Sequence, residues 1–264
     1  ADQGLVPGDV VILYNPTDYS FGGRRDVYRD GGMFKMHSVA SGTGGILVYE
    51  LIPDDYVAAS FDAYKLNGVK VKIDGITVKP CSTSEKAPIK IEYGEGVIIR
   101  GAKCTAGGVY GGIQVNKCYN VVYDCTVSEN NSAHVNNEYG LIISSSQHVK
   151  VTGSAAFATR HAVTLGTDGS AGSVPCRYVT VSGMSLHNQP TSGTGAGDVH
   201  GGSDFVTYEN CVMKGFSGGG RNVRLQGCTV FGFPEQTSGM CVTMPSSTRL
   251  SSTAAMMSSV GAKR

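Results

Sequence analysis

The amino-acid sequence predicts an all-β fold, a right-handed parallel β-helix in which short strands stack into a solenoid. Two observations predict this fold. Short strand-like segments recur along the chain at a nearly constant spacing, and a second set of positions repeats at a fixed offset from them. The composition agrees: the chain has 37 glycines and only 9 prolines, which is typical of a protein with many tight turns and no collagen period.

The repeat consists of segments that mostly alternate apolar and polar residues, which is the periodicity of a β-strand. Their first residues are Val71, Val97, Val121, Val149, Val179, Val206 and Val223. Most of these starts lie 24 to 30 residues apart, and the last two lie 17 apart. Such a spacing suits one coil of a β-helix with three short strands and their turns.

A second column of residues supports the stacking. A glycine lies nine residues before the repeat valine in three of the coils, at Gly112, Gly140 and Gly197. Equal offsets in successive coils predict stacked side chains. In this glycine-aligned register, Asp198 and His200 occupy the positions of Leu141 and Ile143 in an earlier coil, and both would point into the core.

We expect three parts in the chain. Residues 1–66 form a small N-terminal β subdomain, with predicted strands at 10–14 and 45–49, that caps the solenoid. The coils of the parallel β-helix occupy residues 67–245. Residues 246–264 are rich in Ser, Ala and Met and form a tail or a partner-dependent cap, because the open end of a solenoid needs covering.

The composition excludes several classes of partner. Charged residues make up 16% of the chain and the net charge is +1, so nothing predicts binding to nucleic acid or to an anionic membrane. No apolar stretch reaches the length of about 20 residues that crosses a bilayer. The eight cysteines include no CxxC pair, and we expect them to be reduced and to fill the core.

Motifs at several places along the chain resemble those of a known group of proteins. They are Pro7-Gly8-Asp9-Val10-Val11, Arg160-His161-Ala162-Val163-Thr164, Val174-Pro175-Cys176-Arg177 and Gly197-Asp198-Val199-His200-Gly201-Gly202. Over roughly residues 5–233 the chain resembles the pectate-lyase-like right-handed parallel β-helix superfamily, and within it bacteriophage tail-spike and depolymerase domains. Spikes of this kind often carry an Arg-His-Ala turn followed one coil later by an Asp-x-His element.

The resemblance implies a domain that binds and depolymerises a bacterial surface polysaccharide, as a glycoside hydrolase or a lyase. The predicted catalytic residues are Asp198, His200, His161 and Glu138. The predicted substrate-binding residues are Arg160, Tyr139 and Arg177. An acid and a base must be positioned for either reaction, and a glycosidase needs a second carboxylate, which Glu138 in the neighbouring coil could supply. Tyr28 and other tyrosines could stack on sugar rings.

Two alternatives stay open at this point. Asp198 and His200 could instead form a hydrogen-bonded ladder in the core, and the chain would then be a non-catalytic receptor-binding or structural segment of a tail fibre. The fold also hosts lyases, hydrolases, epimerases and binders, so it does not fix the reaction.

The resemblance implies a homotrimer in the tail of a virion, made in bacterial cytoplasm; secretion is the alternative location. We expect no cofactor and no metal ion, because the histidines lack metal-ligand spacing and Asp198, Asp204 and Glu209 make only a weak Ca²⁺ set.

Overall fold

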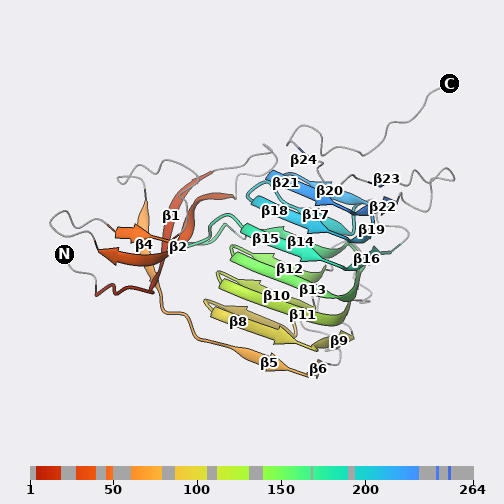
Figure 1. Ribbon diagram of the computed structural model, residues 1–264, viewed down its shortest axis with the longest axis horizontal. Helices are drawn as coiled ribbons and strands as arrows, with labels where there is room; N and C mark the ends of the chain where they lie inside the picture. The colour runs from red at the N-terminus through yellow and green to blue at the C-terminus, as the bar shows by residue number, and fades with distance from the viewer. Residues whose placement is uncertain are drawn as a thin grey trace.

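A computed structural model describes most of the chain and confirms the predicted all-β solenoid (Figure 1). The described residues are 4–18, 28–39, 46–49, 61–78, 87–105, 112–130, 139–167, 169–189, 194–231, 242–243 and 249–250. Within them every regular element is a β-strand and none is a helix. Accordingly, that part of the chain holds no helix capable of spanning a membrane.

The N-terminal strands form a separate antiparallel sheet of four strands in the order β3-β2-β1-β4. They are β1 (Val10–Asp18), β2 (Arg29–Val39), β3 (Ile46–Val48) and β4 (Asp62–Leu66). The two strands expected at 10–14 and 45–49 are therefore present. Figure 1 shows this sheet beside the solenoid.

The solenoid consists of parallel strands stacked in columns. One face contains β7 (Ile89–Glu92), β10 (Ile113–Asn116), β12 (Tyr139–Ser144), β14 (His161–Gly166), β17 (Gly197–Val199) and β20 (Phe216–Gly218). A second contains β5 (Lys72–Asp74), β8 (Glu95–Arg100), β11 (Tyr119–Asn130), β13 (Gln147–Ala158), β15 (Arg177–Ser182), β18 (Asp204–Glu209) and β21 (Arg221–Gln226).

A third column continues from the ends of β11 and β13. It includes β6 (Thr77–Val78), β9 (Lys103–Thr105), β16 (Ser185–Asn188), β19 (Val212–Lys214) and β22 (Thr229–Phe231). Two short strands, β23 (Val242–Thr243) and β24 (Arg249–Leu250), pair antiparallel with the last coil. The rest of the predicted tail, 246–264, lies outside the described residues.

The repeat valines lie in register, as the sequence predicts. Val97, Val121, Val149, Val179, Val206 and Val223 are successive Cα partners across the second column. All six are buried, and most of their strands alternate buried and partly exposed residues. Because side chains alternate between the two faces of a strand, this column gives every coil an inward apolar face.

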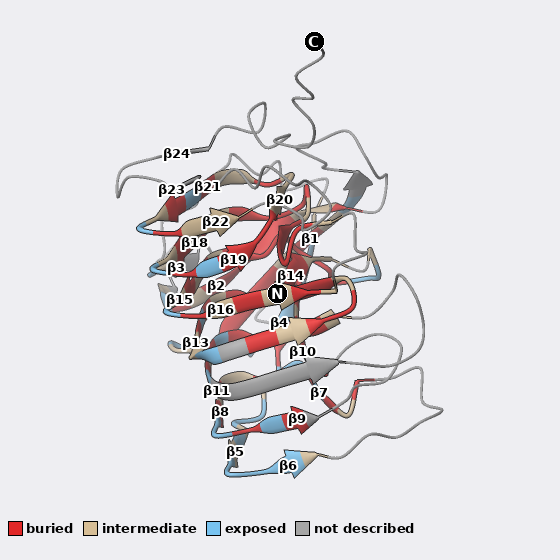
Figure 2. Ribbon diagram, turned by 90° about the vertical axis from the view of Figure 1, so that its right-hand side faces the viewer, coloured by how far each residue is buried: buried red, intermediate tan, exposed pale blue. Residues whose placement is uncertain are grey.

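The core runs along the inside of the stack. Figure 2 shows buried residues in strands such as β14, β16 and β19 and mainly exposed residues at β5 and β6, where the stack begins. Cys104, Cys118, Cys176, Cys211 and Cys228 are free and buried in this core, as predicted for reduced cysteines. Burial raises the pKa of the Cys118 and Cys176 thiols to about 11. Cys81, Cys241 and the side chain of Cys125 lie outside what the structure describes.

The N-terminal sheet is fixed to the side of the solenoid by specific contacts. The backbone N–H of Met33 donates to Gln147 Oε1 at 3.0 Å, and Arg177 Nη1 donates to the carbonyl of Gly31. Gly31 adopts φ +132°, and a Cβ there would lie 2.0 Å from the carbonyl oxygen of Leu13, so only glycine fits. These contacts lie along the flank of the solenoid; the three-part division of the chain itself stays a prediction.

Arg177 and Asp204 form the buried centre of this junction. Their exposed fractions are 1% and 0%, and Arg177 Nε lies 3.7 Å from Asp204 Oδ2. Asp204 also accepts hydrogen bonds from Arg221 Nη2 at 2.7 Å and from Asn222 Nδ2 at 2.9 Å. The predicted role of Arg177 in binding substrate conflicts with this burial, because its guanidinium is held inside the protein. Arg177 instead joins the N-terminal sheet to the solenoid through Gly31 and Asp204.

The junction gives a stability prediction. Asp204→Asn keeps the shape of the side chain but leaves the Arg177 guanidinium buried without its counter-charge, and breaking a buried pair in this way costs about 3–5 kcal/mol. Urea unfolding followed by circular dichroism measures the change. The matched control is Glu209→Gln at the other end of β18, expected within about 0.5 kcal/mol of the wild type. Equal stability of the two variants would contradict the structural role.

Candidate functional site

The pairing of β14 with β17 decides which way Asp198 points. Val163 pairs with Gly197, and Thr164 pairs with Asp198. Since Val163 and Leu165 belong to the core, Thr164 and Asp198 belong to the outward set. The glycine-aligned register was therefore wrong at this coil: Asp198 follows Ile142 and Thr164 in its column rather than Leu141. A shift of one residue moves a strand's side chains to the opposite face, and the inward ladder is excluded.

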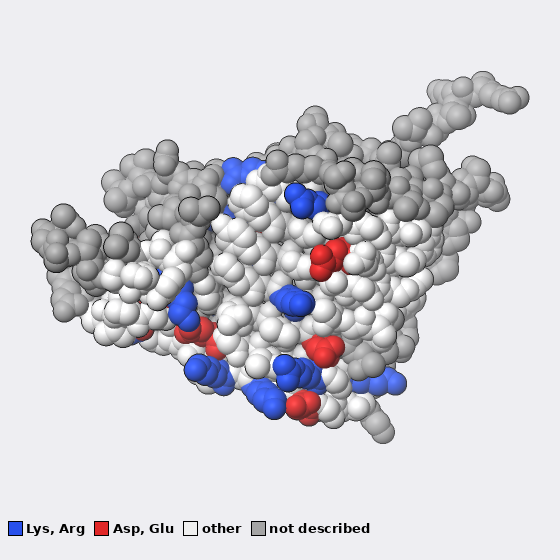
Figure 3. Space-filling model, viewed as in Figure 1, with Lys and Arg blue, Asp and Glu red and all other residues white. Residues whose placement is uncertain are grey.

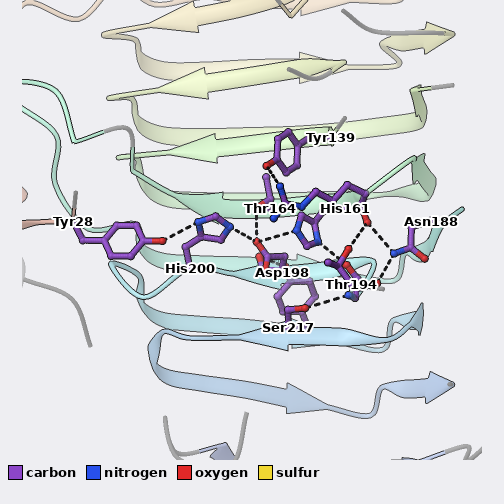
Figure 4. Close-up of polar contacts among 12 residues, drawn as sticks. Tyr28, Tyr139, His161, Thr164, Asn188, Thr194, Asp198, His200 and Ser217 are labelled. Atoms are coloured by element: carbon purple, nitrogen blue, oxygen red, sulfur yellow. Dashed lines mark hydrogen bonds and ion pairs between the residues drawn. The ribbon is translucent and has the colours of Figure 1, made fainter. Parts of the chain in front are cut away.

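Asp198 is an outward-facing residue that is nevertheless well covered. Its side chain is 8% exposed, that of His161 is 3% exposed and that of His200 is 18% exposed. Asp198 Oδ2 accepts a hydrogen bond from Thr164 Oγ1 at 2.7 Å and lies 2.7 Å from His200 Nε2. Figure 4 shows these side chains converging on the carboxylate from neighbouring strands. The site is compact and reaches solvent mainly on the His200 side.

The N-terminal sheet contributes one residue to the site. The Tyr28 hydroxyl lies 3.0 Å from His200 Nδ1, on the opposite side of the ring from Asp198 (Figure 4). Tyr28 is 3% exposed, so it orients His200 rather than offering a ring for a sugar. Gly202 permits this contact, because a Cβ there would lie 2.9 Å from the Tyr28 ring. Tyr28, His200 and Asp198 thus form a continuous chain of polar contacts.

His161 is held in one orientation from both sides. Its Nδ1 lies 2.7 Å from the Gly195 carbonyl, which can only accept, so Nδ1 carries the proton. Its Nε2 then faces Asp198 Oδ2 at 3.8 Å. The Tyr139 ring stacks on the imidazole with centroids 5.6 Å apart. His161 thus meets Asp198 from the preceding coil.

The loop that carries Gly195 is itself anchored. Asn188 Nδ2 donates to the carbonyls of Thr194 and Arg160, at 2.6 and 2.8 Å. Ser217 Oγ accepts from the Gly195 N–H at 3.1 Å. Since these contacts fix the position of the Gly195 carbonyl, the orientation of His161 is set by the fold before any ligand binds.

Electrostatics keep the site in a defined protonation state. Burial alone would raise the pKa of Asp198, but the neighbouring imidazoles and the hydrogen bonds from His200 and Thr164 outweigh it and lower that pKa below its usual value. Burial lowers the pKa of His161, and the nearby carboxylate offsets this only in part. Near neutral pH, Asp198 is therefore ionised and His161 is neutral.

The other predicted site residues differ in their support. Arg160 lies over the Tyr139 ring, with Cζ 5.7 Å from the centroid, and its Nη1 donates to the Tyr139 hydroxyl at 3.2 Å. Arg160 and Tyr139 thus lie directly beside His161. Glu138 lies outside the described residues. Thr164 was missed, because only the β14–β17 pairing reveals it.

A groove of about 360 Å³ lies elsewhere, over β15, β18 and β21. Its lining residues are Tyr178, Thr180, Phe205, Thr207, Asn222 and Arg224. The Tyr178 and Phe205 rings stack on each other with centroids 5.4 Å apart, so these faces are covered by protein. This lining holds no carboxylate or imidazole, whereas the Asp198 cluster holds both.

The described part of the surface seen in Figure 3 carries both signs of charge, with Lys and Arg interspersed among Asp and Glu. This mixed surface agrees with the net charge of +1. It provides no single-sign field on that face that would attract a polyanion over a long distance.

Residues 106–249, more than half of the chain, match the model of the family described as Gp49, pectin lyase-like. The chain belongs to this family. A comparison with curated proteins gave no match.

Three solved phage tailspikes share the fold. The Pseudomonas phage phi297 tailspike gp61 is 36% identical over 87% of this chain and 38% of its own, with a TM-score of 0.80. The Gp54 tailspike of Acinetobacter baumannii bacteriophage AP22, solved with a capsular saccharide, is 25% identical over 86% and 37%, with a TM-score of 0.70. The tailspike gp49 of Pseudomonas phage LKA1 is 24% identical over 86% and 42%, with a TM-score of 0.67. This chain spans less than half the length of each.

The outward orientation of Asp198 is testable with two neighbouring residues. Val199→Asp places a carboxylate in the core, where Val199 is 1% exposed, and we expect it to lower stability by at least about 3 kcal/mol or to prevent folding. Asp198→Asn is expected to fold, because its side chain stays outside the core. Melting temperatures and far-ultraviolet circular dichroism measure both. An unfolded Asp198→Asn beside a stable Val199→Asp would show the opposite register.

Proposed function

We propose that this chain is part of a phage tailspike that binds and depolymerises a bacterial surface polysaccharide at the Asp198 site. The observation that carries the proposal is the pairing of an ionised carboxylate with an imidazole on the outer face of the solenoid. Both hydrolysis and elimination require a group that removes or delivers a proton at the sugar.

The roles follow from position. His200 is the most exposed member of the cluster, and Asp198 and Tyr28 hold its ring from either side. The Asp198–His200 pair as a unit is the group that exchanges a proton with the glycan. His161, with its Nε2 directed at Asp198, lies on the buried side of the cluster. Arg160 and Tyr139 bind the neighbouring sugar, and the Arg160 guanidinium suits a carboxylate or phosphate on an acidic glycan.

The described neighbours of Asp198 in this cluster are two imidazoles and a hydroxyl, not a second carboxylate. A two-carboxylate glycosidase needs the partner acid about 5 to 9.5 Å away. Glu138 is the residue we propose for that place if the reaction is a hydrolysis. If the reaction is an elimination, His200 and Asp198 suffice as the base.

Two relatives support a polysaccharide ligand and a place in the virion for this chain. One tailspike of this fold was solved with a capsular saccharide, and the more similar one is also a tailspike. We extend these two properties to this chain: a polysaccharide partner and a place in the phage tail, after synthesis in bacterial cytoplasm. Assembly as a homotrimer remains a proposal that rests on the resemblance seen in the sequence.

The second candidate function is a non-catalytic receptor-binding segment. It is favoured by one observation: Asp198 and His161 are mostly covered and hydrogen-bonded within the protein. In that case the cluster would stabilise the coil, and binding would need no proton transfer.

The depolymerase proposal predicts release of reducing ends from at least one member of a panel of bacterial capsule and O-antigen polysaccharides. Asp198→Asn and His200→Ala are expected to lower the rate by about 10²- to 10⁴-fold, the usual contribution of acid–base catalysis. Absorbance of an unsaturated product separates elimination from hydrolysis.

The matched control is His187→Ala, which removes a histidine that contacts Ser185 on β16, outside the cluster. It is expected to retain activity. Binding of a panel glycan without any release by the wild type would support the receptor-binding segment instead. Equal activity of all three variants would show that the chemistry lies elsewhere.

A further inference from the structure

The Asp198 site has a property that acid–base chemistry alone does not require: its donor atoms converge on one point. One ligand atom from each of His161, Asp198 and His200 can be chosen so that all three lie within 4.8 Å of one another. Among the residues that the structure describes, no other group of three His, Cys, Asp or Glu side chains does so. We propose that these three residues form a binding site for a divalent transition-metal ion.

Both imidazoles are oriented as metal ligands are. In metal sites the far ring nitrogen of a ligating histidine is usually bonded to a carbonyl, carboxylate or water, which fixes the tautomer and aims the other nitrogen at the ion. His161 Nδ1 donates to the Gly195 carbonyl, so the lone pair is on Nε2, which faces Asp198. His200 Nδ1 contacts the Tyr28 hydroxyl, and its Nε2 also faces Asp198.

The distances suit one ion with small adjustments. With bonds of 2.0–2.1 Å and tetrahedral angles, two ligand atoms on zinc lie about 3.3 Å apart. The separations from Asp198 Oδ2 are 3.8 Å to His161 Nε2 and 2.7 Å to His200 Nε2, one longer and one shorter than that value. A modest movement of the His200 ring, the most exposed of the three, brings both into range.

The ligand set selects the class of ion. Two imidazoles and one carboxylate suit Zn²⁺, Co²⁺, Mn²⁺ or Fe²⁺, whereas Ca²⁺ and Mg²⁺ prefer oxygen ligands. Three protein ligands leave a fourth position open, as in catalytic zinc sites. The exposed side of His200 places that position toward solvent.

That the ion serves the glycan site rests on the proposed function. That an ion binds at all rests only on the geometry of the three side chains. The sequence did not reveal this site, because its ligands lie in two different coils. Asp198 is 37 residues and His200 is 39 residues from His161. The expectation of no metal came from this spacing, and the folded arrangement gives reason to replace it.

Cobalt binding tests the site without any glycan. The chain, stripped with a chelator and dialysed, is titrated with Co²⁺ while visible absorption and bound metal are measured. We expect one ion per chain, a cobalt spectrum of nitrogen and oxygen ligands, displacement by Zn²⁺ and none by Ca²⁺ or Mg²⁺. His200→Ala and Asp198→Asn are expected to lose the spectrum, and His187→Ala to keep it. Tyr28→Phe is expected to weaken binding about 10- to 100-fold.

The outcomes separate this inference from the proposed function. No ion retained by the wild type, or a spectrum unchanged in both His200→Ala and Asp198→Asn, would overturn the metal site whatever the variants' stability. Folding of each variant is checked by circular dichroism. Cobalt binding without cleavage of any glycan would support the metal site and contradict the depolymerase. Cleavage of a glycan by a chelator-treated protein that binds no ion would contradict the metal site and support the depolymerase.

Discussion

The in-register parallel pairing of β14 with β17 is the constraint on which the site depends. It places Val163 against Gly197 and therefore Thr164 against Asp198, on the outer face. A shift of one residue would bury the carboxylate among Val163, Leu165 and their neighbours, at a cost far above the worth of any single hydrogen bond. The same stacking of coils that builds the core also determines which residues a ligand can meet.

The N-terminal sheet links stability to the site. It reaches the solenoid through Gly31 and Arg177, and through Tyr28 and His200. The first contact is part of a buried ionic junction with Asp204, and the second orients the imidazole that faces solvent. Since Tyr28 and Gly31 lie three residues apart, the junction that fixes the sheet also fixes the tyrosine. A loosened sheet is expected to disturb His200 before it disturbs the core.

The sequence was informative where the repeat is regular. The valine column from Val97 to Val223 predicted the true register, because each of these residues fills the same inward position in its coil. The glycine column failed at Gly197. There the Ala196 carbonyl accepts a hydrogen bond from the Ala162 N–H, and Gly197 pairs with the next residue, Val163. Because Ala196 and Gly197 are both small, side-chain size does not show which of them lies at the position of the earlier glycines.

The remaining errors and gaps concern contacts between distant parts of the chain. Arg177 carries the right chemistry for an anionic glycan, but its burial depends on a carbonyl 146 residues away. Tyr28 contacts His200 across 172 residues. Neither contact has a local signal, since periodicity reports only which face of a strand a residue occupies. The cluster of His161, Asp198 and His200 likewise exists only once the coils are stacked.

We propose that a glycan sits against the outward Asp198–His200 pair. Histidine modification read out by mass spectrometry, with and without an oligosaccharide that the chain binds, tests this placement. We expect His200 to be modified in the free protein and protected by the oligosaccharide, while His187 on β16 reacts equally in both states. Protection of His187 alone, or a His200 that reacts equally with and without the oligosaccharide, would contradict it.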